Sequence, residues 1–297
     1  MTHTTQAGYV GVIGRPNVGK STLINRLLGH KINITSRKPQ TTRTNVLGIK
    51  TEVNYQAIFV DTPGLHQDGN KAINRLMNRS AESVIHDVDV LLMVIERLKW
   101  TDEDEHVWRK ASFASCPTLL VINKVDTLEN KNSLLPFIAQ VNNRHTFEQT
   151  HCIAARSGLC TDELMDSIVQ RLPVSDFFYD AQQITDKTER FLVAEIVREK
   201  LMRQLGNEMP YAVAVDVEQF TVRDDVAHIG LKILVERDSQ KAIVIGKNGQ
   251  RLKSIGIQAR QDIEQLLGTK AMITLWVKTK TSWADDERTL TSLGYTS

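Results

Sequence analysis

YVGVIGRPNVGKSTLINRLL, residues Tyr9–Leu28, places a strand-like run, a glycine-rich loop and a helix-like run in immediate succession. Tyr9–Ile13 is apolar and favours a β-strand, and Lys20–Leu28 has the pattern of a helix that ends at Gly29. The loop between them, Gly14–Ser21, matches G-x-x-x-x-G-K-[S/T] in the strand–loop–helix context that a phosphate-binding loop requires. This segment therefore predicts a nucleoside-phosphate site.

The residue types in this loop supply the chemistry of phosphate binding. Gly14 and Gly19 let the backbone direct N–H groups at phosphate oxygens, and the helix N-terminus adds a favourable potential. Lys20 places a cation at the β- and γ-phosphates, and the Ser21 hydroxyl can ligate Mg²⁺. We assign the loop and its next residue to nucleotide binding: Gly14, Arg15, Pro16, Asn17, Val18, Gly19, Lys20, Ser21 and Thr22.

Two further motifs follow apolar strands. Asp61-Thr62-Pro63-Gly64 offers a carboxylate for a second Mg²⁺ contact and an N–H, that of Gly64, for the γ-phosphate. Asn123-Lys124-Val125-Asp126 offers the Asp126 carboxylate, which can accept hydrogen bonds from N1–H and the 2-amino group of guanine. Adenine lacks both donors, so the order of these motifs predicts a guanine nucleotide pocket.

The surrounding sequence predicts an α/β domain over residues 1–174. Val88–Ile95 and Thr118–Ile122 are continuous apolar runs, which are typical of parallel strands covered on both faces. Helix-like stretches alternate with the strands, so we expect a mostly parallel sheet with helices on both faces. A polar linker, 175–186, follows, and Asp186 has the spacing to Glu189 of a capping box that opens a helix.

Residues 187–284 have the predicted order α-β-β-α-α-β, and 285–297 form a C-terminal tail. Gly246-Lys247-Asn248-Gly249 lies between two expected helices, inside a segment (245–280) with seven Lys or Arg against two Asp or Glu. Such a loop exposes backbone and cations to a phosphodiester strand, with apolar side chains beside it to receive bases. As apolar walls we predict Ile243, Val244, Ile255 and Ile257; as RNA-binding residues we predict Ile243, Gly246, Lys247, Asn248, Gly249, Arg251 and Lys253.

The composition excludes several classes of protein. The 297 residues are 41% hydrophobic and 24% charged, which indicates a folded chain of about two domains. The net charge of +2 confines any nucleic-acid surface to a local patch. The three cysteines lack C-x-x-C spacing, so neither a disulfide framework nor a zinc site is indicated. The longest apolar runs reach six residues and the N-terminus lacks a signal-peptide pattern, so we expect a cytosolic protein without a membrane-spanning helix.

Together these motifs resemble two known families. Gly14–Ser21, Asp61–Gly64 and Asn123–Asp126, in this order, resemble the P-loop GTPases, and the region around Gly246–Gly249 resembles a type II KH domain. Both in one chain resemble the Era family of bacterial ribosome-assembly GTPases over about residues 7–295, the ending Trp283–Arg288 included. The resemblance implies GTP or GDP with Mg²⁺, binding near the 3′ end of 16S rRNA in the 30S subunit, and a cytoplasmic location with some peripheral contact with the inner membrane. A monomer is the default expectation.

The resemblance also implies roles for residues that spacing alone does not assign. Gln40-Thr41-Thr42-Arg43 is similar to a first switch, so the implied Mg²⁺ ligands are Ser21, Thr42 and Asp61. Leu65 stands where Ras-like enzymes have a water-orienting Gln, and Asn17 resembles an asparagine that helps hold K⁺, so slow, potassium-stimulated hydrolysis is implied. The implied base-binding loop is Ile153, Ala154 and Ala155, with Ala154 in place of the usual Ser; the implied catalytic residues are Lys20, Thr42, Gly64 and Asn17.

Two other classes of function remain open at this level. A P-loop ATPase or small-molecule kinase would share Gly14–Ser21, but Asn123–Asp126 argues against it, and competition between GTP and ATP decides. A GTP-regulated switch that binds a protein or membrane partner would share both domains without binding RNA. The basic segment 245–280 argues against that alternative.

Overall fold

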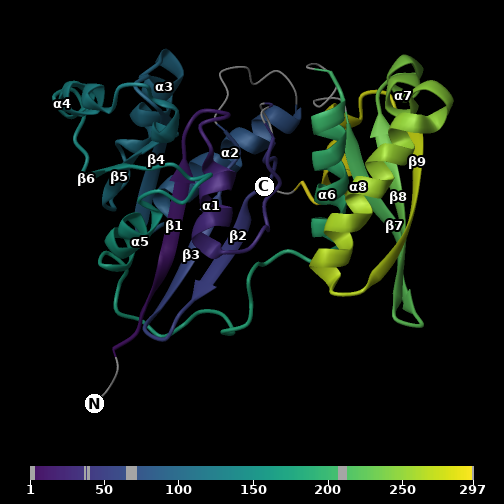
Figure 1. Ribbon diagram of the computed structural model, residues 1–297, viewed down its shortest axis with the longest axis horizontal. Coiled ribbons are helices and arrows are strands. Elements are labelled where there is room, and N and C mark those ends of the chain that lie inside the picture. Colours follow the sequence, from purple (N-terminus) through teal and green to yellow (C-terminus); the bar gives the residue numbers. More distant parts are fainter. Residues whose placement is uncertain (1–3, 37, 39–40, 65–71, 207–212, 296–297) are drawn as a thin grey trace.

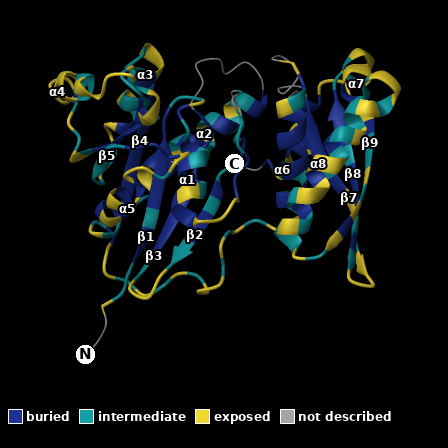
Figure 2. Ribbon diagram, viewed as in Figure 1, coloured by how far each residue is buried: buried dark blue, intermediate teal, exposed yellow. Residues whose placement is uncertain are grey.

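The computed structural model describes residues 4–36, 38, 41–64, 72–206 and 213–295 (Figure 1). We call residues 4–172 the N-terminal part and residues 188–295 the C-terminal part. The central strands of both sheets are mostly buried in Figure 2, whereas the outer helices α4 (Leu134–Asn142) and α7 (Asp238–Ile245) are largely exposed. Within the described residues, no helix has both the length and the apolar character needed to cross a bilayer.

The N-terminal part is built on a six-stranded sheet with the order β2-β3-β1-β4-β5-β6. Only β2 runs antiparallel to its neighbour, so the predicted mostly parallel α/β fold is confirmed. Its strands are β1 (Gln6–Ile13), β2 (Val46–Thr51), β3 (Tyr55–Asp61), β4 (Val90–Glu96), β5 (Thr118–Asn123) and β6 (Gln149–Cys152). Its helices are α1 (Lys20–Leu28), α2 (Ala72–His86), α3 (Asp102–Ala111), α4 and α5 (Thr161–Val169).

Helices cover both faces of this sheet, which explains the continuous apolar runs. In β4, Val90, Leu92 and Val94 pack into the core beneath α1 and α5. The alternate residues Leu91, Met93 and Ile95 pack into the core beneath α2, α3 and α4. A strand with two buried faces needs no polar alternation, and the carboxyl ends of the parallel strands are left to carry the polar motifs.

The C-terminal part has the predicted order α-β-β-α-α-β. Its sheet has the order β7-β8-β9, with β7 and β8 antiparallel and β8 and β9 parallel. Helices α6 and α8 cover the face that is turned toward the N-terminal part (Figure 1). Besides α7, its elements are α6 (Glu189–Gln204), β7 (Ala214–Arg223), β8 (Val226–Val235), α8 (Gln250–Leu267), β9 (Lys270–Thr279) and α9 (Glu287–Ser292).

The predicted cap of α6 is wrong by two residues. The helix begins at Glu189, and the N-cap is Thr188, whose hydroxyl accepts a hydrogen bond from the Phe191 N–H at 3.3 Å. Asp186 instead accepts a hydrogen bond from the Leu47 N–H at 2.9 Å. Asp186 therefore fastens the connecting segment to β2, where that strand leaves its outer edge open.

The C-terminal end of the chain lies between the two parts (Figure 1). The segment predicted as a tail contains α9, and Trp283, Leu290 and Tyr295 form one buried cluster with Ile73 and Met77 of α2. Helix α2 was not predicted from the sequence. Because this cluster contains residues of both parts, the last described residues of the chain form part of the interface between them.

We expect Leu290→Ala to weaken this contact. The Leu290 side chain is fully buried, so its truncation should lower the free energy of unfolding by about 2–5 kcal/mol. Urea unfolding monitored by tryptophan fluorescence measures the change. Leu135→Ala, at a leucine that is 76% exposed, is the matched control and should cost less than about 0.5 kcal/mol. Equal effects of the two substitutions would contradict the packing described.

Candidate functional site

The loop between β1 and α1 has backbone geometry that requires glycine at two positions. Gly14 has φ 150°, and a Cβ there would lie 2.3 Å from the Val94 carbonyl oxygen. Gly19 has φ 106°, and a Cβ there would lie 2.3 Å from Nδ2 of Asn123. The loop can therefore press against β4 and against the Asn123–Asp126 motif only because both side chains are absent.

Lys20 and Asp61 are buried charges at the centre of the site. Lys20 Nζ donates to the Gly14 carbonyl at 2.9 Å and to the Arg15 carbonyl at 3.2 Å. Burial lowers the pKa of Lys20 to about 8, against the opposing effect of Asp61, and burial raises the pKa of Asp61 to about 6. A bound phosphate would raise the pKa of Lys20 and a bound cation would lower the pKa of Asp61, because each favours the charged form of its partner.

Three side-chain oxygens converge where the resemblance implies a metal. The Thr42 hydroxyl donates to Oδ2 of Asp61 at 3.1 Å, so the Ser21 hydroxyl, 2.9 Å away, donates to Thr42. Oδ1 of Asp61 is buried and has no hydrogen-bond partner among the described residues. An unsatisfied carboxylate oxygen beside two hydroxyls fits Mg²⁺, which prefers oxygen ligands.

The Asp61–Gly64 motif packs directly on the phosphate-binding loop. The Thr62 hydroxyl donates to the Val12 carbonyl at 2.8 Å, and a Cβ on Gly64 would lie 2.9 Å from Cγ of Pro16. Gly64 is therefore packed so closely against Pro16 of the phosphate-binding loop that a side chain there would clash. The predicted site residue Leu65, and Gln40 of the switch-like motif, lie outside the described residues.

The residues predicted to recognise the base are joined by the Asn123 side chain. Its Nδ2 donates to the Val18 carbonyl at 2.8 Å, and its Oδ1 accepts from the Ala155 N–H at 3.0 Å. Lys124 Nζ donates to the Asn17 carbonyl at 2.7 Å. Asp126 is exposed, in the turn after Lys124, and is open to a ligand.

The loop after β6 lies against the other base-recognition residues. The Ile153 carbonyl accepts from the Val125 N–H at 3.2 Å, and the Ala154 N–H donates to the Leu159 carbonyl at 3.1 Å. Ala154, where a serine is usual, is buried. The structure therefore brings Ile153, Ala154 and Ala155 together with Asn123.

The structure also shows supporting residues that the sequence analysis missed. The Arg15 guanidinium lies 3.2 Å from the carboxylate of Asp104 and 3.4 Å from that of Glu96. Glu96 also lies 3.3 Å from Nζ of Lys124, so one carboxylate links the phosphate loop to the base-recognition motif. The position of Glu96 at the carboxyl end of β4 was the available sequence signal.

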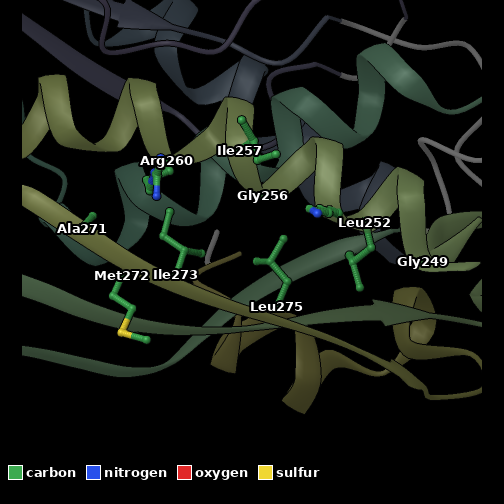
Figure 3. Close-up of a pocket in the computed structure, with 10 residues that line it drawn as sticks. Gly249, Leu252, Gly256, Ile257, Arg260, Ala271, Met272, Ile273 and Leu275 are labelled. Carbon is green, nitrogen blue, oxygen red and sulfur yellow. The ribbon is translucent and has the colours of Figure 1, made fainter.

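The C-terminal part contains a hollow of about 570 Å³ between α8 and β9 (Figure 3). Residues from α8 line it at helical spacing, and Ala271, Ile273 and Leu275 of β9 line it at strand alternation. Arg260 and Lys253 add positive charge to an otherwise apolar wall. The lining residues are Gly249, Leu252, Lys253, Gly256, Ile257, Arg260, Ala271, Met272, Ile273 and Leu275.

Three of the four predicted wall residues, Ile243, Val244 and Ile255, do not line this hollow, whereas Ile257 does. Val244 and Ile255 are fully buried in the core beneath the sheet, so their assignment to the groove was wrong. Each of these side chains points into the core and away from the groove. The sequence alone does not show whether an apolar residue on a helix faces the core or a groove. Of the residues predicted to bind RNA, Gly249 and Lys253 line the hollow.

The other predicted RNA-binding residues lie in or beside the glycine loop. Ile243 is 42% exposed, and its carbonyl accepts a hydrogen bond from Arg251. Gly246 has φ 73°, and Lys247 and Asn248 follow it in a short turn, Lys247–Gly249, that leads into α8. The structure thus places the glycine loop at the N-terminal end of the groove-lining helix.

Comparisons with known proteins agree with both sites. Residues 9–124 match a family described as 50S ribosome-binding GTPase, and residues 208–284 match the KH domain family. GTPase Era of Pseudomonas aeruginosa strain PAO1 is 51% identical over 98% of this chain and 95% of its own length. GTPase Era of Ectopseudomonas mendocina is 52% identical over 98% of this chain and 97% of its own length.

Two solved structures have the same arrangement of both parts. A crystal structure of Era with MgGDPNP and nucleotides 1506–1542 of 16S ribosomal RNA matches with a TM-score of 0.96 at 36% identity. A variant of Aquifex aeolicus Era bound to GDP and AlF₄⁻ matches with the same score and identity. Each comparison covers 99% of this chain and 100% of the other.

The fold and the nucleotide site thus define a P-loop GTPase that carries a KH domain. This class excludes the ATPase and kinase alternative. At about half identity over nearly its whole length, the chain belongs to the Era family of GTPases.

We expect Gly19→Ala to weaken GTP and GDP binding alike. The new Cβ would displace the Asn123 amide from Val18, and the loss of that buried hydrogen bond should lower both affinities by roughly tenfold or more. Fluorescent nucleotide titration measures the dissociation constants. Gly29→Ala is the matched control, because Gly29 also has a positive φ but a Cβ there would have no atom within 4 Å. Unchanged affinities in Gly19→Ala would refute the proposed contact.

Proposed function

We propose that this chain is a GTP-driven switch that binds 16S rRNA near its 3′ end and assists assembly of the 30S subunit. The observation that carries the proposal is the match, over both parts, to Era holding MgGDPNP and 16S rRNA nucleotides. The groove between α8 and β9 supports it, because its apolar wall suits unstacked bases and its cations, Lys253 and Arg260, suit phosphates.

The nucleotide site is assigned by residue. The backbone of Gly14–Thr22 and the Lys20 ammonium bind the phosphates, and the Asp126 carboxylate selects guanine. Ser21, Thr42 and Asp61 hold Mg²⁺, which when bound neutralises charge on the phosphate oxygens. Gly64 packs against Pro16 of the phosphate loop, so its N–H can donate to the γ-phosphate; in-line attack of water on the γ-phosphorus then breaks the bond to the β–γ bridging oxygen and releases GDP and phosphate.

The same residues make the switch. With the γ-phosphate present, Thr42 and Gly64 have partners in the site, so the loops that carry them are ordered. Hydrolysis removes those partners, the loops relax, and the RNA is released. We place the protein in the cytoplasm as a monomer, with peripheral contact with the inner membrane as a further prediction from the family resemblance.

The experiment is cross-linking and sequencing of RNA bound to the purified protein, first with GDPNP and then with GDP. We expect one peak near the 16S rRNA 3′ end with GDPNP and at least about tenfold less with GDP. The double substitution Lys247→Asp and Asn248→Asp should remove the peak, because it puts two carboxylates where a phosphodiester strand would lie.

The chain offers a matched control for that variant. Lys131 and Asn132 have the same residue types in sequence, are exposed, and lie in the N-terminal part. Lys131→Asp with Asn132→Asp makes the same change in charge and should leave the peak intact. A peak on 23S rRNA would overturn the proposed partner, and no peak in either state would favour the protein- or membrane-binding switch.

We also propose that K⁺ acts at Asn17. Asn17 is exposed within the phosphate loop and has φ 66°, and its carbonyl accepts a hydrogen bond from Lys124. Leu65 stands where related GTPases have a glutamine that orients the attacking water, so another group must assist hydrolysis. A potassium ion held there would supply the charge that an arginine finger supplies elsewhere.

We therefore expect GTP turnover to be roughly tenfold or more faster in KCl than in NaCl, given that an arginine finger contributes about 10³–10⁵. Asn17→Gly tolerates the positive φ but removes the side-chain oxygen, so the difference between the salts should vanish. Asn17→Asp tolerates the same backbone and keeps an oxygen, so the difference should persist. Equal turnover of the unmodified protein in both salts would rule out the potassium site.

A further inference from the structure

Helix α6 buries three consecutive charged residues. Arg198, Glu199 and Lys200 are 1%, 0% and 5% exposed, although their sequence resembles the charged side of a surface helix. Buried charges are tolerated only where partners compensate for the loss of water. Three of those partners, Lys31, Thr35 and Thr41, lie in the loop between α1 and β2, which we call the α1–β2 loop and which contains Thr42.

Arg198 holds the residue before Thr42. Its guanidinium donates to the Thr41 carbonyl and pairs with the Glu195 carboxylate, with Nε 2.7 Å from Oε1. Arg198 therefore fixes the peptide group between Thr41 and Thr42, and with it the backbone that carries the Thr42 side chain. Both Arg198 and Glu195 belong to the C-terminal part, so this support comes from outside the GTPase fold.

Arg43, the residue after Thr42, is itself held by the C-terminal part. Its buried side chain donates to the Val213 carbonyl at 2.9 Å and to the Tyr295 hydroxyl at 3.3 Å. The guanidinium carbon lies 5.8 Å from the ring centre of Trp283, within the range of a cation–π contact. Thr42 is thus bracketed by two arginine contacts, and each joins the α1–β2 loop to the C-terminal part.

Glu199 fixes the same loop further upstream. Its carboxylate accepts from the Thr35 N–H at 2.8 Å and from Lys31 Nζ at 2.8 Å. Lys31 and Lys200 both donate to Asp262 of α8, at 2.9 and 2.5 Å. The loop that carries Thr42 is therefore connected, through α6, to the helix that lines the groove.

We infer that Arg198 is a positioning residue for the GTPase reaction, which holds Thr42 at the Mg²⁺ site from the C-terminal part. The inference rests on the proposed function in one respect, the assignment of Thr42 as a ligand of Mg²⁺. Thr42 contributes to binding when Mg²⁺ and the γ-phosphate are both present. Arg198 therefore favours GTP over GDP, and a residue that merely stabilised the fold would affect both nucleotides equally.

The test compares GDPNP and GDP affinities of Arg198→Gln in the full chain with Mg²⁺ present. We expect the GDPNP affinity and kcat to fall about tenfold, as for loss of one charge-assisted hydrogen bond, while the GDP affinity changes less than about twofold. Arg190→Gln is the matched control: Arg190 lies on the same helix but donates to the Val217 carbonyl within the C-terminal part, so both affinities should hold. Equal losses for GDPNP and GDP, or no loss, would overturn the inference.

A double-mutant cycle with Thr42→Ala separates this inference from the proposed function. If Arg198 acts through Thr42, Arg198→Gln should have little further effect on GDPNP affinity in the Thr42→Ala background. If Thr42→Ala alone leaves GDPNP affinity unchanged, the proposed role of Thr42 fails. If Thr42→Ala has the effect and Arg198→Gln does not, the inference alone fails.

Arg198→Lys keeps the buried positive charge and a hydrogen-bond donor group. It therefore tests the inference even if Arg198→Gln fails to fold. We expect an intermediate, roughly threefold loss of GDPNP affinity with GDP affinity unchanged. Parallel loss of both affinities in Arg198→Lys would show that the residue only supports the fold.

Discussion

The Asn123 side chain joins the loops around the nucleotide, and the geometry of the site depends on it. It binds the Val18 carbonyl of the phosphate loop and the Ala155 N–H of the loop after β6. These contacts need Gly19, since any Cβ there would occupy the place of the amide. The two glycines of the phosphate loop therefore serve more than phosphate access: Gly14 admits the β4 backbone, and Gly19 admits the residue that aligns base recognition with phosphate recognition.

A second constraint is that the three proposed Mg²⁺ ligands come from segments with different supports. Ser21 lies in the first turn of α1 and Asp61 ends β3, so both are fixed by the sheet and its helices. Thr42 lies in a loop, and its neighbours Thr41 and Arg43 are held by residues of the C-terminal part. Two of the proposed ligands are therefore fixed within the N-terminal part, whereas the position of the third, Thr42, depends on contacts with the C-terminal part. Whether all three ligands are in place thus depends on where the C-terminal part lies.

The sequence predicted the parts of the site that depend on local geometry. Gly14–Ser21, Asp61–Gly64 and Asn123–Asp126 follow β1, β3 and β5, so all three lie at the carboxyl edge of one parallel sheet; β3 and β1 are adjacent, and β4 separates β1 from β5. It could not separate Val244 and Ile255 from the groove, since apolar residues on two faces of a helix look alike. Nor could the sequence show that Arg198 and Glu199 are buried. A charged helix face that contacts solvent and one that contacts another domain have the same residue periodicity. The cap at Thr188 was missed because Asp186 has a competing partner, Leu47, that only the tertiary fold supplies.

The bracketing of Thr42 has a thermodynamic consequence for RNA. Coupling between two sites is reciprocal, so a C-terminal part that favours Thr42 at the metal site must itself be favoured in that placement by GTP. Asp262 belongs to this network and lies on α8, two residues from the groove residue Arg260. RNA that selects one placement of α8 will therefore raise GTP affinity by the factor by which GTP raises RNA affinity. Coupling energies of this kind are typically about 1–3 kcal/mol. A hydrogen bond to a charged group contributes about 1.5–3 kcal/mol, so the bonds from Arg198 and Glu199 to the α1–β2 loop have the magnitude that such a coupling requires.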